Sequence, residues 1–168
     1  MWPKGRLSIS DCAALYRAPI KEDISLFCEA IRNHAGENVT EQQIFAVTPE
    51  LWAIDLVILT VAFDVCKASS EVARPLVLAI AGEQSALTNT HFLDRIVYYG
   101  NAIGGVTADK TPLLVARAFM MVSQIQFQSE RTDVNPVALE WAIASVATGS
   151  LQGLCELTLL YSKKYGWK

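Results

Sequence analysis

Residues 48–68 read TPELWAIDLVILTVAFDVCKA, and most of them are apolar. Thr48 and Pro49 suit the start of a helix, because threonine caps a helix and proline at its first position loses no hydrogen bond. At roughly 100° per residue, one narrow sector of this helix is polar. That sector contains Glu50, Thr60, Asp64 and Lys67. Since apolar side chains cover the rest, the pattern predicts a central helix that is buried on several sides.

Asp55 lies within the apolar arc of that helix. A buried carboxylate without a partner is costly, so Asp55 must pair, take up a proton or face a cavity. One interpretation is an ion pair with an arginine or hydrogen bonds to a neighbouring helix end. The other is a residue that lines a ligand pocket or a partner groove. The candidate arginines are Arg74, Arg95 and Arg117.

The rest of the chain also has helical spacing, and no stretch alternates apolar and polar residues as a half-buried strand does. Pro19, Thr48-Pro49, Pro75 and Gly149-Ser150 are interpreted as helix boundaries. Thr40 and Gln43 match a capping box for a short helix at 40–46. We therefore expect an all-α fold of seven or eight helices around the central helix at 48–68. The length of 168 residues predicts a single domain, 1–168.

The composition indicates the class of protein and the compartment in which we expect it. The chain is 52% hydrophobic and 18% charged, which is typical of a globular protein and favours a buried oligomer interface. We expect a cytoplasmic protein, because no apolar segment of a signal peptide follows Met1. Charged residues within 48–68 argue against a membrane span. The widely spaced cysteines are expected to be reduced core thiols: Cys12, Cys28, Cys66 and Cys155.

No catalytic, metal-binding or phosphate-binding motif is present in the sequence. The cysteines form no C-x-x-C pair, and the chain has two histidines, which argues against a zinc site. No serine lies in a nucleophile elbow, and no glycine-rich loop joins a strand to a helix. The sequence therefore gives no positive support for an enzyme, a cofactor or a metal.

Two surfaces are candidates for binding a partner protein. Nine acidic and three basic residues lie between Asp11 and Asp64, so an acidic surface could steer a basic partner. The same charges could instead be ordinary solvated helix faces. The second surface is a mixed edge of arginine, methionine and glutamine near 117–128, whose methionines could equally be core residues. The candidates are Glu22, Asp23 and Glu29 on the first surface, and Arg117, Met120, Met121, Gln124 and Gln128 on the second.

The C-terminal residues combine basic and aromatic side chains, and the N-terminal Trp2, Lys4 and Arg6 do the same. Such a mixture can bind a phosphate backbone and stack on bases. The C-terminal candidates for nucleic-acid contacts are Lys163, Lys164, Trp167 and Lys168. Lysines at a helix C-terminus also offset the helix dipole, and the net charge of −3 favours that interpretation.

Three functions are consistent with the sequence. The leading hypothesis is a non-enzymatic helical interaction module, either an adaptor or an inhibitor such as an immunity or anti-defence protein. Its partner would be another protein or a second copy of the chain. The second hypothesis is a small nucleic-acid-associated subunit that uses the basic termini. The third is a small-molecule-binding bundle or an enzyme with Asp55 in its pocket.

Overall fold

The computed structural model describes residues 7–36, 39–88, 92–128 and 136–167, with the backbone alone at 87–88 and 124–128. These residues form six α-helices, one 3-10 helix and no strand. The elements are α1 (Ile9–His34), α2 (Glu41–Val65), α3 (Ser70–Thr88), α4 (Leu93–Ile103), η1 (Ala108–Lys110), α5 (Thr111–Gln128) and α6 (Pro136–Tyr165). The expected all-α fold is confirmed.

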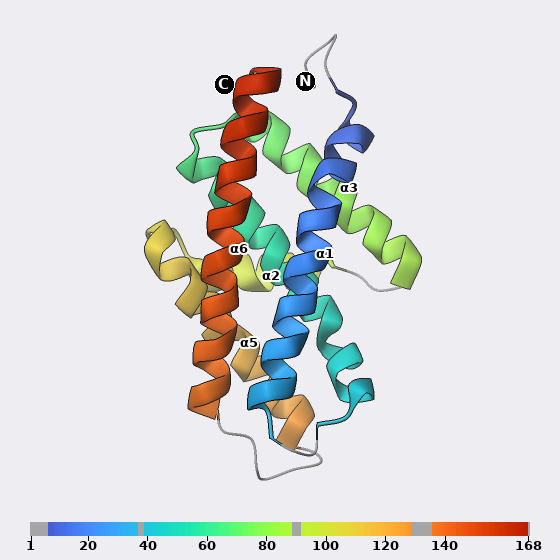
Figure 1. Cartoon of the computed structure of the whole chain (residues 1–168), viewed down its shortest axis with the longest axis vertical. Helices are drawn as coiled ribbons and strands as arrows, with labels where there is room; N and C mark the ends of the chain where they lie inside the picture. The colour runs from blue at the N-terminus through green and yellow to red at the C-terminus, as the bar shows by residue number, and fades with distance from the viewer. Residues whose placement is uncertain (1–6, 37–38, 89–91, 129–135, 168) are drawn as a thin grey trace.

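Helix α2 is the centre of the molecule. It packs against α1, α3, α4, α5 and α6. Its residues from Glu50 to Leu59 are all buried. Figure 1 shows α1 and α6 side by side along the length of the molecule, with α2 behind them, and α1 begins at the end where α6 finishes. The prediction of a central helix buried on several sides is therefore confirmed.

The expected seven or eight helices are wrong, because the described residues contain six α-helices. The predicted boundaries at Pro19, Pro49 and Pro75 lie inside α1, α2 and α3. The predicted break at Gly149-Ser150 lies inside α6. Proline in a helix interior costs about 3 kcal/mol, but burial of neighbouring apolar side chains on both sides offsets this cost. The helices at 40–46 and 48–68 are thus one helix.

Local signals at the helix ends agree better with the structure. The capping box of Thr40 and Gln43 is confirmed, and it opens α2. Helix α6 ends at Gly166, which has a φ of 65° and so adopts the left-handed conformation that glycine tolerates. The Trp167 amide then donates to the Ser162 carbonyl at 3.1 Å. This turn directs Trp167 back into the core, where it is buried.

Candidate functional site

Three polar side chains from α1, α2 and α6 meet in the interior, and we call them the carboxyl cluster: Asp23, Asp55 and Ser150. Asp55 is fully buried, as its place in the apolar arc predicts. Its Oδ1 atom accepts a hydrogen bond from Ser150 Oγ. Ser150 Oγ also lies 2.9 Å from Asp23 Oδ2. Ser150 Oγ therefore contacts both carboxyl groups.

The electrostatics of the carboxyl cluster favour a protonated state. Burial raises the pKa of Asp55 well above its usual range, and the negative charge of Asp23 raises it further. Burial also raises the pKa of Asp23. The ordinary pKa of an aspartate is about 3.9. Both carboxyl groups therefore hold protons to a higher pH than free aspartates do.

The structure pairs Asp55 with none of the three candidate arginines; its hydrogen bond comes from a neighbouring helix, α6, but from the middle of that helix and not from its end. Arg95 pairs with Glu50, and Arg117 pairs with Glu140. Arg74 is exposed on α3 and does not act on the Asp55 carboxyl. The sequence argument did not name Ser150, because it named arginines as candidate partners and gave no residue for the hydrogen-bonding alternative. The signal that could have found it is a polar residue at a buried position of α6, between Ala147 and Leu154.

A second polar group lies near the start of the same helix. Glu50 was predicted in the solvent sector, but it is buried. Its Oε1 atom lies 2.6 Å from Arg95 Nε, and the Tyr99 hydroxyl donates to Oε2 at 2.8 Å. Both partners come from α4, which covers this part of α2. Burial, and then the nearby Glu50 carboxylate, raise the pKa of Tyr99, so its hydroxyl stays a donor.

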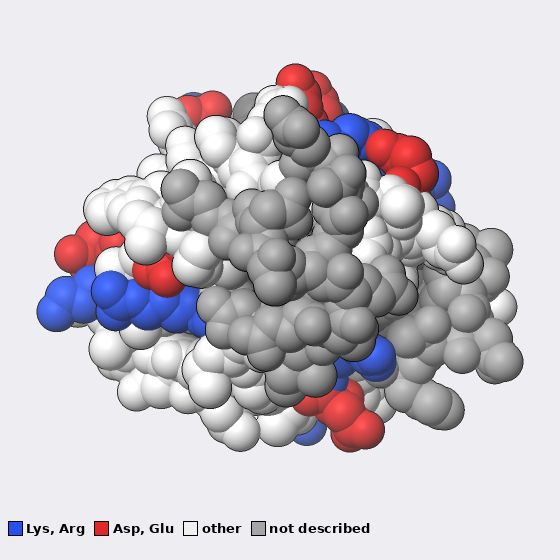
Figure 2. Space-filling model, turned by 90° about the horizontal axis from the view of Figure 1, so that it is seen from below, with Lys and Arg blue, Asp and Glu red and all other residues white. Residues whose placement is uncertain are grey.

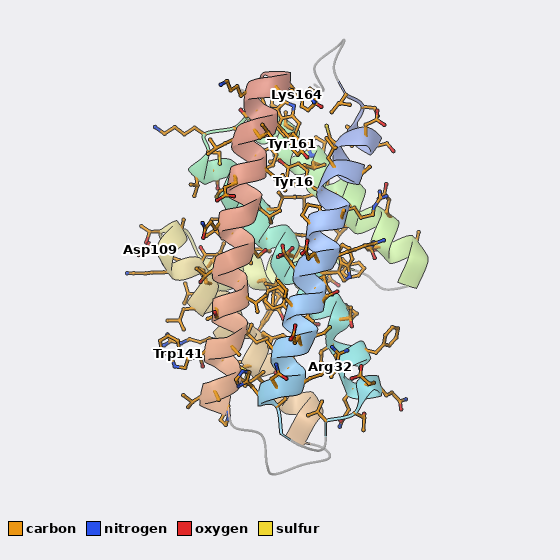
Figure 3. All side chains as sticks on the ribbon, in the orientation of Figure 1. Tyr16, Arg32, Asp109, Trp141, Tyr161 and Lys164 are labelled. Atoms are coloured by element: carbon orange, nitrogen blue, oxygen red, sulfur yellow. The ribbon has the colours of Figure 1, made fainter. Side chains whose placement is uncertain are left out.

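The C-terminal aromatic residues pack in the interior. Trp167 stacks with Phe63 at a ring-centroid distance of 5.8 Å and lies against Tyr161 at 6.0 Å. Tyr16 joins this cluster and hydrogen-bonds Thr158 at 2.9 Å. In Figure 3, Tyr16 and Tyr161 meet between α1 and α6 near the end that carries Lys164.

This packing bears on the predicted nucleic-acid contacts. The Trp167 ring is 2% exposed, so it is not available to stack on a base. Lys163 and Lys164 are exposed in the last turn of α6, where lysines complement the helix dipole. Lys168 lies outside the described residues.

Four exposed side chains of α5 and α6, together with the half-buried Leu113, form what we call the α5–α6 surface: Leu113, Arg117, Met121, Val137 and Trp141. The three α5 residues are spaced by four, so they share one helix face. Arg117 Nε lies 3.1 Å from Glu140 Oε1, which joins this face to α6. Trp141 is 66% exposed, and Met121 is 67% exposed. Large apolar side chains therefore flank an ion pair on an open surface.

A groove of about 360 Å³ adjoins the α5–α6 surface. It lies between α6 and the region where η1 leads into α5, and Trp141 lines it. In Figure 3, Trp141 and Asp109 both project on the side of α6 that faces away from α1. The remaining lining residues are Pro112, Leu113, Ala144, Ser145 and Thr148. The groove is thus mainly apolar or neutral, with Asp109 as its acidic group.

The structure divides the predicted mixed edge. Arg117 and Met121 belong to the α5–α6 surface, but Met120 is a buried core residue. The side chains of Gln124 and Gln128 lie outside the described residues. Sequence reasoning missed Trp141 and Val137 as members of this surface. Their signal was an apolar side chain on the face of α6 opposite to Leu139 and Ile143, which are buried.

The predicted acidic surface is also divided. Glu22 and Glu29 are exposed on α1, whereas Asp23 turns inward to the carboxyl cluster. Leu26 lies between the two glutamates and is exposed as well. Figure 2 shows the end of the molecule seen from below, where acidic and basic side chains are interspersed around the described rim. The acidic-surface hypothesis therefore depends on Glu22 and Glu29.

A second groove, of about 500 Å³, lies between α1 and the start of α2. Phe45 lines it and is 75% exposed. Arg32 Nε and Glu41 Oε1 lie 2.7 Å apart across this groove, so its ion pair is satisfied. Asp55 lines neither this groove nor the one beside Trp141.

Three glycines of the helices make no close contact with a neighbouring helix in the described part of the chain. A Cβ atom at Gly149 or Gly153 in α6 would meet no atom within 4 Å. The same holds at Gly100 in α4. These glycines are therefore not needed for close helix packing within the described residues.

Two helices, α2 and α6, are long and apolar enough to cross a membrane by length and composition alone. The apolar window of α2 is 72% buried inside the molecule, as in the core helix of a soluble protein, whereas that of α6 is 33% buried. Among the described residues, no group of three histidine, cysteine or acidic side chains could hold a metal ion. The four cysteines are free thiols.

No protein-family model matches the chain, and no curated protein or solved structure is significantly similar to it.

Proposed function

We propose that this protein is a non-enzymatic, cytoplasmic helical interaction module, an adaptor or an inhibitor, that binds another protein through the α5–α6 surface. The four free thiols fit a reducing compartment. The exposed Trp141 side chain carries the proposal. Tryptophan, arginine and methionine are enriched in protein interfaces, and an aromatic anchor beside a pocket is the usual form of an energetic hot spot.

The chemistry of the α5–α6 surface suggests the kind of segment that it accepts. Met121, Val137 and Trp141 offer apolar contact area, and methionine adapts its shape to different partners. Asp109 lies in the adjoining groove as an acidic group. An apolar partner segment with a basic residue beside it fits this arrangement. Electrostatic attraction of that residue would contribute specificity more than affinity.

The test compares two exposed aromatic residues on different surfaces. Trp141→Ala removes the proposed anchor, and Phe45→Ala is the matched control in the groove beside Arg32. The tagged protein is first purified from its host to identify a stoichiometric partner. The affinity of that purified partner for each variant is then measured. Trp141→Ala is expected to weaken binding by at least about 30-fold, because hot-spot residues contribute about 2 kcal/mol or more.

Phe45→Ala is expected to bind the partner as tightly as the unaltered protein. Equal affinity of all three proteins would refute the α5–α6 surface as the binding site. Loss of binding in Phe45→Ala alone would place the site in the groove of α1 and α2 instead. If the captured partner is a second copy of this chain, the same variants are compared by sedimentation velocity. Trp141→Ala should then shift the population toward monomer.

The acidic residues of α1 are tested separately. Reversing Glu22 and Glu29 to lysine is expected to slow association with a basic partner, and the difference should shrink as salt is added. An unchanged association rate at low salt would show that these glutamates are an ordinary solvated face. Asp23 is left unaltered in this experiment, because it contacts Ser150 in the interior.

A further inference from the structure

The carboxyl cluster joins three helices, but when both carboxyl groups are ionised it has fewer hydrogen atoms than its polar contacts need. Ser150 Oγ makes two close polar contacts, one with Asp23 and one with Asp55. A hydroxyl carries a single hydrogen, and an ionised carboxylate carries none. Ser150 can therefore supply a hydrogen to one of the two contacts. The other contact becomes a hydrogen bond when its carboxyl group is protonated and donates to Ser150 Oγ.

An independent observation also favours a protonated Asp55. Oδ2 of Asp55 is fully buried and has no hydrogen-bond partner within the described part of the chain. An unsatisfied, ionised oxygen in this environment is costly. Protonation of Asp55 makes this carboxyl group neutral. It thus lowers the cost of burying Oδ2 and removes the repulsion between the two carboxylates.

We propose that Asp23, Asp55 and Ser150 form a proton-dependent latch, in which one bound proton holds α1 against α2 and α6 and loss of that proton loosens α1. When the proton leaves, the O–H bond of the carboxyl group breaks and the proton passes to water. Two carboxylates then face each other with the single Ser150 hydrogen between them. The latch is independent of the α5–α6 surface, which lies on other residues.

The surrounding charges do not stabilise the doubly ionised state. On α1, Glu22 is the next charge that acts on Asp23, and it is negative. On α2, Asp55 is influenced by Asp23, and α6 contributes the uncharged Ser150. Within the described residues, no group from α3, α4 or α5 acts on either carboxyl. A proton is therefore the available positive charge for this cluster.

The latch acts on one segment of α1. The start of α1 is held by Tyr16, which contacts Thr158 and the aromatic rings around Trp167. Asp23 lies further along the helix, between the buried residues Ile20 and Phe27. Ionisation should therefore loosen residues 20–27 while the segment around Tyr16 stays packed. This difference gives the latch a local signature that general destabilisation lacks.

The sign of the pH dependence follows from proton binding. In the unfolded chain the two aspartates titrate near pH ~3.9, whereas in the folded chain their pKa values are raised. The folded state therefore binds more protons above about pH 4, and the free energy of unfolding falls as the pH rises through the folded pair's titration. The stabilisation by the latch is present at low pH and is lost at high pH.

The experiment compares the unaltered protein with Asp23→Asn/Asp55→Asn, whose amides supply hydrogens without titrating. Glu22→Gln is the control for a neighbouring exposed acid. Unfolding by urea and hydrogen exchange of residues 20–27 are measured from about pH 5 to pH 9. In the unaltered protein and in Glu22→Gln, protection of this segment, corrected for intrinsic exchange, should fall at least about tenfold, which corresponds to one pKa unit. The double variant should change less than about twofold.

Infrared spectroscopy provides a second readout that a merely structural role would not change. The unaltered protein should show the carbonyl band of a protonated, buried carboxyl group at the acidic end of this pH range, with loss of the band toward the basic end, and the double variant should lack it. If the double variant does not fold, Asp55→Asn alone should lack the band. Absence of the band from the unaltered protein, or equal pH profiles for the unaltered protein and the double variant, would overturn the latch.

Discussion

Helix α2 buries two carboxylates five residues apart, and the molecule satisfies them in different ways. Glu50 is matched by a cation and a phenol from α4, namely Arg95 and Tyr99. Asp55 is matched by a hydroxyl from α6 and a second acid from α1. The partners of the first carboxylate supply a positive charge and a hydrogen-bond donor. Within the described residues no cation contacts the second, so its charge depends on the pH of the solution.

The difference arises from which helix covers each part of α2. Near its start, α2 faces α4, and the Arg95 side chain there is still 37% exposed and reaches water. In its middle, α2 lies between α1 and α6, where Ser150 is 2% exposed. A large cation fits the first environment, whereas the second has space for small polar groups. The shallower burial at Glu50 thus allows an ion pair, whereas the deeper burial at Asp55 favours two carboxyl groups that bind a proton.

The largest expected effect on stability comes from breaking the ion pair between Arg95 and Glu50. Arg95→Leu should lower the free energy of unfolding by about 3 kcal/mol, because it leaves the Glu50 charge buried without its cation. Chemical unfolding measures this value. Glu50→Gln in the Arg95→Leu background should recover part of the loss, since a neutral amide needs no counterion. A loss below about 1 kcal/mol would mean that water already screens Glu50 as at an exposed site.

The hydroxyl of the carboxyl cluster should have the next largest effect. Ser150→Ala is expected to lower the free energy of unfolding by about 2 kcal/mol at neutral pH, because buried carboxyl oxygens lose their donor. Ser145→Ala is the matched control, since Ser145 is exposed on the same helix. The control should change stability by less than about 0.5 kcal/mol. Equal effects at the two serines would contradict the contacts assigned to Ser150.

Two adjacent tyrosines on α4 allow a charged hydrogen-bond acceptor to be compared with a neutral one. The Tyr99 hydroxyl donates to the Glu50 carboxylate, whereas the Tyr98 hydroxyl donates to the Ala118 carbonyl at 3.1 Å. Tyr99→Phe should cost about 1.5 kcal/mol and Tyr98→Phe no more than about 1 kcal/mol. Thermal unfolding of both variants under identical conditions checks the order. The reverse order would show that Arg95 alone satisfies Glu50.

The sequence predicted one of the two carboxylate sites in part and the other not at all. Asp55 is buried as the apolar arc implied, but its partner is 95 residues away on α6 and uncharged. Glu50 shares a helical sector with Asp64 and Lys67, so it was assigned to solvent. Residues of one helical sector point in nearly the same direction along the whole of α2, but different neighbouring helices cover that sector at different points. Contacts of this kind depend on tertiary packing, which periodicity does not encode.

The helix boundaries show the same limit of prediction from local sequence. Thr40 and Gln43 determine a real helix start through local hydrogen bonds, and the sequence sufficed there. Thr48 and Pro49 resemble a second start, but the Thr48 hydroxyl donates to the Ile44 carbonyl at 3.2 Å within a continuous helix. The cost of the proline is local, whereas the packing that offsets it comes from distant segments. A boundary signal is therefore reliable when tertiary burial does not oppose it.

The smallest effect is expected at the exposed ion pair of the α5–α6 surface, which completes the comparison with Glu50. Arg117→Ala removes an arginine whose side chain is 59% exposed, and Glu140 then gains solvent in place of its partner. Because exposed pairs contribute little after screening, the free energy of unfolding should change by less than about 1 kcal/mol. Urea unfolding of Arg117→Ala beside Arg95→Leu checks this. A loss as large as that of Arg95→Leu would show that Arg117 holds α5 against α6 through the packing of its stem. A small loss would instead leave Arg117→Ala folded and suitable for measuring how the α5–α6 surface binds its partner.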